Sequence, residues 1–126
     1  MGDLSKNLSR HEFACTCGCG FDTVDAKTVE VIQDVCDNFS CRVNISSGCR
    51  CFEYNRLPAS EGGPGSSDGS QHPRGRAGDC HFLGVAPDVV WVYVNEKYPE
   101  LYGFGLYSWG VHIDTRTNGP ARWDGR

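Results

Sequence analysis

The sequence has no long apolar run. Neither its first ten residues, "MGDLSKNLSR", nor any later segment is apolar over enough positions for a signal peptide or a membrane span. This absence predicts a chain that is made and folded in a cytosol and does not insert into a membrane.

An excess of positive charge is also missing. The net charge is −4, and the 12 lysine and arginine residues are scattered along the chain. A basic patch is the electrostatic footprint of nucleic-acid binding and of docking on anionic lipid, so the sequence argues against both. The 126 residues contain no internal repeat and no linker, which predicts a single domain over residues 1–126. We expect a monomer.

Cysteine is abundant, but the C-x-x-C spacing of common zinc fingers does not occur. Five of the 8 cysteines gather in two short motifs, "CTCGCG" and "CRC". Cytosolic chains use such clusters as metal ligands or leave them reduced, whereas exported domains oxidise them to disulfides. Two alternatives therefore stay open for these cysteines, a second, structural zinc ion or one or two disulfides: Cys15, Cys17, Cys19, Cys49 and Cys51.

Hydrophobic periodicity and turn residues predict an α+β domain. The clearest helix covers residues 21–39, with Asp22 or Thr23 as its cap and an apolar stripe that includes Ile32. Pro87 suits the first turn of a second helix over residues 86–99. The remaining expected elements are a strand at 41–46, a helical turn at 51–58, a flexible loop at 59–69, a strand at 77–83 and an antiparallel hairpin at 102–116.

The segment "SQHPRGRAGD" places His72 and Asp79 at two ends of a stretch that cannot be an α-helix. Pro73, Gly75 and Gly78 argue against a helix between them. A loop that enters a strand is the remaining interpretation, with His72 at its mouth and Asp79 on the strand.

The segment "VHID" contains a second histidine and aspartate that could bind a metal ion. On a strand, His112 and Asp114 share one face, roughly 7 Å apart. Two histidines and one carboxylate, with water in the fourth position, form a common catalytic zinc site, in which the metal lowers the pKa of its water and polarises a substrate carbonyl.

"SQHPRGRAGD" resembles the S-x-H-x-x-G-x-A-x-D signature of the zinc D-Ala-D-Ala carboxypeptidases and their relatives. These relatives include phage endolysin peptidases, vancomycin-resistance dipeptidases and the hedgehog signalling domain. "ISSGCRCFEYN" looks like another segment of that family, and "YGFGLYSWGVHIDTR" is similar to the closing stretch of its small phage-type branch. The resemblance implies a small α+β fold with an antiparallel sheet and helices packed on one side.

The resemblance also assigns roles. His72, Asp79 and His112 would be the zinc ligands, and Arg50 would hold a substrate carboxylate or the developing oxyanion. Ser70 would hydrogen-bond bound peptide or serve only as a turn residue. Trp109, with Tyr107, would line a peptide groove or simply pack.

The chain departs from the family where a general base is expected. Family enzymes carry an acid shortly before the last histidine, but residues 101–111 contain none. Asp114 is the candidate base; it could instead orient His112 or Arg116 from behind the metal, or itself become a ligand. His81, on the strand of Asp79, is a further acid–base candidate or a structural histidine.

Together with the candidate zinc ligands, the resemblance implies a zinc peptidase that hydrolyses peptidoglycan stem or cross-link peptides with zinc-bound water, as a carboxypeptidase or an endolysin-type endopeptidase. Such a protein would be made in a host cytoplasm and act at the cell wall after release, or as a virion component. The alternative is a non-catalytic module that keeps zinc and binds peptide or stabilises a phage structure, favoured by the missing acid. A third possibility is a structural metal domain held by its cysteines.

Overall fold

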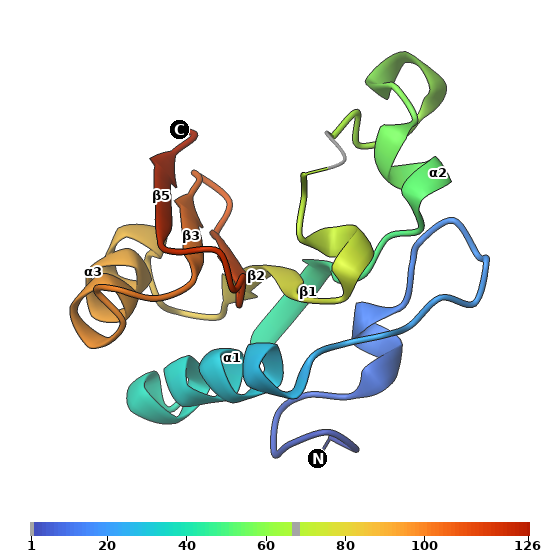
Figure 1. Ribbon diagram of the computed structural model, residues 1–126. Helices are drawn as coiled ribbons and strands as arrows, with labels where there is room; N and C mark the ends of the chain where they lie inside the picture. Colours follow the sequence, from blue (N-terminus) through green and yellow to red (C-terminus); the bar gives the residue numbers. More distant parts are fainter. Residues whose placement is uncertain (1, 67–68) are drawn as a thin grey trace.

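The computed structural model describes residues 2–66 and 69–126, and its topology is α+β, as expected from the sequence (Figure 1). The described residues form three α-helices: α1 (Ala26–Phe39), α2 (Phe52–Arg56) and α3 (Pro87–Lys97). Their five strands are β1 (Val43–Ser47), β2 (Ala77–Phe82), β3 (Gly103–Leu106), β4 (Val111–Asp114) and β5 (Ala121–Asp124). Short 3₁₀ turns lie at Arg10–Phe13, Ala59–Glu61 and His72–Arg74.

Helix α1 begins later than the sequence indicated. Asp25 occupies the N-cap position, so the prediction that Asp22 or Thr23 caps the helix is wrong. The backbone N–H of Asp25 donates to the carbonyl of Gly75 at 2.7 Å, and this tertiary contact holds the preceding residues outside the helix. The predicted apolar stripe is buried along the helix, with Ile32 fully enclosed.

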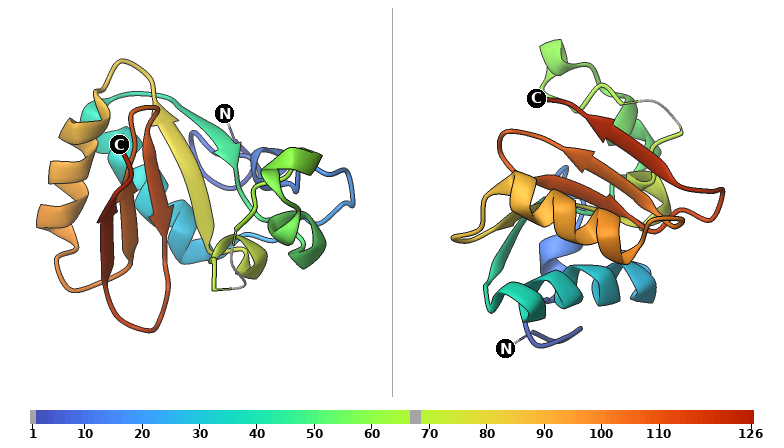
Figure 2. Two further views of the ribbon diagram at one scale, coloured as in Figure 1. Left: turned by 90° about the horizontal axis from the view of Figure 1, so that it is seen from above. Right: turned by 90° about the vertical axis from the view of Figure 1, so that its left-hand side faces the viewer.

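Helix α3 starts at Pro87, whose fixed φ and missing N–H suit the first turn of a helix. Val90 and Val94 are its buried residues. The helix packs on β3 and β4, while α1 packs on β2 and β4, and the two helices also contact each other. Both therefore cover one face of the sheet (Figure 2).

The five strands form one sheet in the order β1-β2-β4-β3-β5. Neighbours are antiparallel from β1 to β3, but β5 runs parallel to β3, so the sheet is mixed rather than wholly antiparallel. Strand β5 was not predicted. Asp114 ends β4 opposite Gly103, and the short loop 115–120 then delivers Ala121 to the other side of Gly103.

The two faces of the sheet differ in chemistry because successive strand residues alternate sides. One face meets α1 and α3 and holds the apolar core, which includes Cys80, Phe82, Phe104, Leu106, Val111 and Ile113. The opposite face of β2 and β4 carries Asp79, His112 and Asp114. Alternation thus separates the core from the polar side chains within the same strands.

Beyond the polar face, α2 and the turn after it extend away from the sheet (Figure 1). The predicted helical turn at 51–58 is confirmed as α2. The predicted loop 59–69 includes the 3₁₀ turn Ala59–Glu61, while its positions 67 and 68 lie outside the described residues. No helix in the described ranges has the length and apolar content needed to cross a membrane.

We predict that Ile32→Ala lowers the free energy of unfolding by about 2–5 kcal/mol, because it removes a fully enclosed side chain between α1 and the sheet. Urea unfolding measures the change, and Glu30→Ala on the exposed side of the same helix serves as the control. An equal, small effect of the two substitutions would contradict this placement of the core.

Candidate metal centre

His72, Asp79 and His112 converge on the polar face of the sheet. Asp79 on β2 pairs directly with His112 on β4, and His72 lies in the 3₁₀ turn that precedes β2. Oδ1 of Asp79 is 3.3 Å from Nε2 of His72 and 3.0 Å from Nδ1 of His112. Each of the three residues offers one ligand atom, and these atoms all lie within 4.8 Å of one another.

Each histidine is held from behind by an oxygen acceptor. Nδ1 of His72 contacts the carbonyl oxygen of Gly48, and Nε2 of His112 lies 2.7 Å from Oδ2 of Asp114. If a metal ion is bound, the proton of each ring would lie on the nitrogen that faces Gly48 or Asp114, and the other nitrogen would donate its lone pair to the metal. Those other nitrogens, Nε2 of His72 and Nδ1 of His112, both point at Asp79.

Two ring nitrogens and a carboxylate oxygen stand close together here, so a proton or another cation is favoured among them. Burial tends to raise the pKa of Asp79, but hydrogen bonding with His112 and His72 outweighs it and holds this pKa well below its usual range. Burial tends to lower the pKa of His112, yet Asp114 and Asp79 raise it. The surroundings therefore favour a cation here, and the donor set of two imidazoles and a carboxylate fits zinc.

A pocket of about 390 Å³ opens over these three residues. Arg50, Ser70 and Trp109, all singled out from the sequence, line it. Four other lining residues were not predicted from the sequence to belong to the site: Ser66, Gln71, Arg116 and Trp123.

Comparison with protein-family models matches residues 6–114 to the family described as Peptidase M15. The chain belongs to the peptidase M15 family. Comparisons with curated proteins and with solved structures gave no significant match. M15 peptidases are zinc-dependent metallopeptidases, which agrees with the donor set formed by His72, Asp79 and His112.

In this M15 chain Arg50 lies next to the metal ligands. Its Nη2 donates to Oδ2 of Asp79 at 3.2 Å, and its Nε donates to the hydroxyl of Ser47 at 2.9 Å. Nη1 donates to Asn55 of α2 and to Ser66. The guanidinium is thus fixed at the pocket wall by four partners from different segments.

Asp114 lies behind His112 and is fully buried. The guanidinium of Arg116 clamps its carboxylate through Nε at 2.9 Å and Nη2 at 2.7 Å. Burial tends to raise the pKa of Asp114, but the bonds with Arg116 and His112 hold it well below its usual range. Of the alternatives left open by the sequence, this geometry favours orientation of His112 over proton transfer in the pocket.

His81 lies in different surroundings from Trp109 and Trp123, the two tryptophans that line the pocket. Nδ1 of His81 is 3.1 Å from the carbonyl oxygen of Trp109, and its exposed side chain is not among the residues that line the pocket. The Trp109 ring stacks on Tyr107 and is 44% exposed. Trp123 lies 5.0 Å from the His112 ring, and its indole N–H donates to the hydroxyl of Tyr107.

Trp123 reaches the site because Gly105 leaves room for it. A Cβ on Gly105 would stand 2.4 Å from the indole ring, so only glycine fits beneath Trp123 at that position of β3. A glycine at position 105 within a predicted strand was the signal that another group packs closely over it. Recognising that group as Trp123 required strand β5, which was not predicted.

We predict that Asp114→Asn weakens zinc binding about 10–100-fold, because the amide loses the charge that holds the His112 N–H and the Arg116 clamp. Competition with a chromophoric chelator measures the affinity. Asp124→Asn removes an exposed carboxylate paired with Arg126 and should leave zinc affinity unchanged. Native zinc affinity in Asp114→Asn, combined with lost turnover, would instead identify Asp114 as the general base.

Proposed function

We propose that the protein is a zinc endopeptidase that hydrolyses amide bonds in the stem or cross-link peptides of peptidoglycan. The observation that carries the proposal is the convergence of His72, Asp79 and His112 at a pocket whose wall also holds Arg50. Membership of the M15 family supports the reaction class, and the peptidoglycan substrate follows from the motif resemblance.

In this proposal, His72, Asp79 and His112 hold the zinc ion. Bound there, zinc supplies a Lewis acid that polarises the scissile carbonyl and lowers the pKa of water. Gly48 and Asp114 fix the two imidazoles by accepting their outward N–H groups, so that the ligand nitrogens need no reorientation when substrate arrives. Trp109 and Trp123 provide aromatic walls for the peptide.

The hydrogen bonds of Arg50 support an endopeptidase rather than a carboxypeptidase. A guanidinium has five N–H donors, and the described partners of Arg50 occupy four of them. Recognition of a terminal carboxylate uses two parallel N–H groups, whereas an oxyanion needs one. The remaining Nη2 donor therefore suits a single developing oxyanion next to the metal ligands.

One observation favours a second candidate, a zinc-containing module that binds peptide without turnover. Among the described residues that line the pocket, Asp79 is the only carboxylate, and it is already assigned to the metal. The lining thus offers no separate acid to accept the proton of the attacking water, as general acid–base catalysis requires.

Release of new amino termini from purified peptidoglycan decides between these two candidates. The zinc-loaded chain should release them, and His72→Ala should lose both the release and the zinc ion of the His72, Asp79 and His112 site. If zinc binding depends on His72 but the chain releases no amino termini from any type of peptidoglycan, the protein is the non-catalytic binding module.

Cross-linked fragments whose peptide C-termini are amidated test which class of bond is cut. Continued release from these fragments supports the endopeptidase, and loss of release on amidation indicates a carboxypeptidase.

We predict that Arg50→Gln lowers kcat about 10²–10³-fold while zinc remains bound, because it removes a charged donor at the developing oxyanion. Steady-state kinetics on a soluble cross-linked fragment, alongside zinc content, measures both effects. Arg42→Gln, an exposed arginine outside the pocket lining, is the matched control. A rise in KM with unchanged kcat would contradict the oxyanion role and indicate ground-state binding alone.

A further inference from the structure

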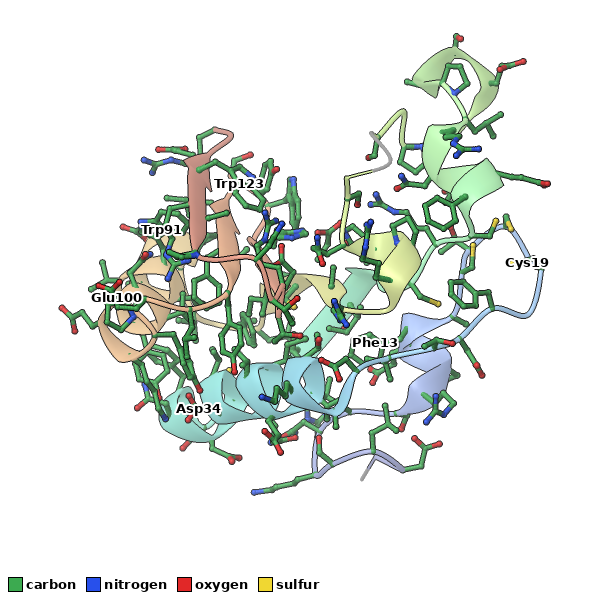
Figure 3. All side chains as sticks on the ribbon, viewed as in Figure 1. Phe13, Cys19, Asp34, Trp91, Glu100 and Trp123 are labelled. Atoms are coloured by element: carbon green, nitrogen blue, oxygen red, sulfur yellow. The ribbon has the colours of Figure 1, made fainter. Side chains whose placement is uncertain are left out.

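Four cysteines from two distant parts of the chain come together at the far end of the molecule from α3. Cys15, Cys17 and Cys19 lie in the loop after the first 3₁₀ turn, and Cys51 directly precedes α2. Figure 3 shows sulfur atoms gathered near the labelled Cys19, where that loop passes the start of α2. The four sulfur atoms all lie within 4.8 Å of one another.

The spacing of these sulfur atoms fits a tetrahedral metal site. With Zn–S bonds of about 2.3 Å, the sulfur atoms of a tetrahedral site stand about 3.8 Å apart. Sγ of Cys17 is 3.4 Å from Sγ of Cys15 and 3.7 Å from Sγ of Cys51. A disulfide would bring a pair to about 2.05 Å, whereas all four cysteines are free.

Cys49, the fifth cysteine of the two motifs, is excluded from this group. Its thiol is buried and donates to the carbonyl oxygen of Phe21 at 2.9 Å. In "CRC", therefore, Cys49 points into the protein and Cys51 toward the cluster. The motif makes both cysteines candidate ligands, but only Cys51 lies among the grouped sulfur atoms.

The backbone around the cluster turns tightly and directs N–H groups at the sulfur atoms. Gly18 and Gly20 have φ values of +84° and +86°, a left-handed conformation that lets the chain turn twice within "CTCGCG". Backbone N–H groups also face the sulfur atoms: that of Cys51 donates to Sγ of Cys15 at 3.5 Å, and that of Tyr54 donates to Sγ of Cys51 at 3.4 Å. Such bonds stabilise thiolate ligands.

Apart from the backbone bond from the N–H of Cys15 to the carbonyl of Phe21 that closes it, the loop makes few contacts that hold it in place. Residues 16–20 are all exposed, and none of them belongs to the apolar core. Chain segments that bury little apolar surface commonly depend on a metal ion or disulfides for their order. A bound ion would supply the missing cross-link between this loop and α2.

We propose that Cys15, Cys17, Cys19 and Cys51 bind a second, structural zinc ion that fixes the segment carrying Arg50. Cys51 follows Arg50 directly and caps α2, where Asn55 accepts a hydrogen bond from the Arg50 guanidinium. The backbone N–H of Arg50 donates to the carbonyl of His72. The cysteine site thereby connects the N-terminal loop to the wall of the pocket.

Elemental analysis of the purified chain and its variants tests the proposal without reference to catalysis. The native chain should hold two zinc ions, and Cys51→Ser and His72→Ala should each lose a different one. Cys41→Ser, which changes a partly buried cysteine outside the cluster, should keep both. A native chain with one zinc ion that His72→Ala removes would overturn the cysteine site and leave the proposed function intact.

Two measurements on the native chain keep the test decisive if Cys51→Ser fails to fold. X-ray absorption at the zinc edge should show a Zn–S shell near about 2.3 Å in addition to nitrogen and oxygen ligands. Alkylation after unfolding with a chelator and without reductant should label all 8 cysteines. A disulfide among the four cluster residues, or a zinc spectrum without sulfur, would contradict the proposal.

Discussion

The antiparallel pairing of β2 with β4 is the constraint on which the rest of the site depends. Its register sets Asp79 directly opposite His112 and Ala77 opposite Asp114. A shift of one residue would turn His112 and Asp114 toward α1 and place Val111 and Ile113 on the pocket side. The apolar core therefore enforces the register, because Val111 and Ile113 are fully buried against the helices. The same hydrophobic burial that stabilises the domain also positions the metal ligands.

Charged and hydrogen-bonding groups follow one another from Arg50 through Asp79 and His112 to Asp114 and Arg116. Arg50 contacts one oxygen of Asp79, the two histidines face its other oxygen, and behind His112 the Asp114 carboxylate is neutralised by Arg116. Every buried carboxylate in this series has a cationic or N–H partner, which offsets the cost of removing it from water. The arrangement leaves one location where further positive charge is favoured, among the three ligand atoms. These three atoms lie at the floor of the pocket.

Much of the fold, and the strand that carries His112, could be predicted from local sequence patterns. The stripe that includes Ile32, Pro87 at the start of α3 and the hairpin that carries His112 are local signals, and all were found in the sequence. Further residues of the pocket wall were not predicted because long-range contacts bring them there. Trp123 lies on β5, which pairs in parallel with β3, and Ser66 accepts a hydrogen bond from Arg50. The role of Asp114 was left open since spacing places it on the face of His112 but cannot show that Arg116 covers it. Likewise, the motif "CRC" cannot reveal that only Cys51 joins the other three cysteines.

The central claim is that His72, Asp79 and His112 hold a zinc ion at the floor of the pocket. Anomalous diffraction from crystals of the native chain, recorded on both sides of the zinc absorption edge, tests it most directly. The account predicts a zinc peak about 2.0–2.2 Å from Nε2 of His72, Nδ1 of His112 and an oxygen of Asp79. Zinc-loaded crystals with no peak among these three atoms, or with His112 coordinating through Nε2 and turned away from Asp114, would contradict it.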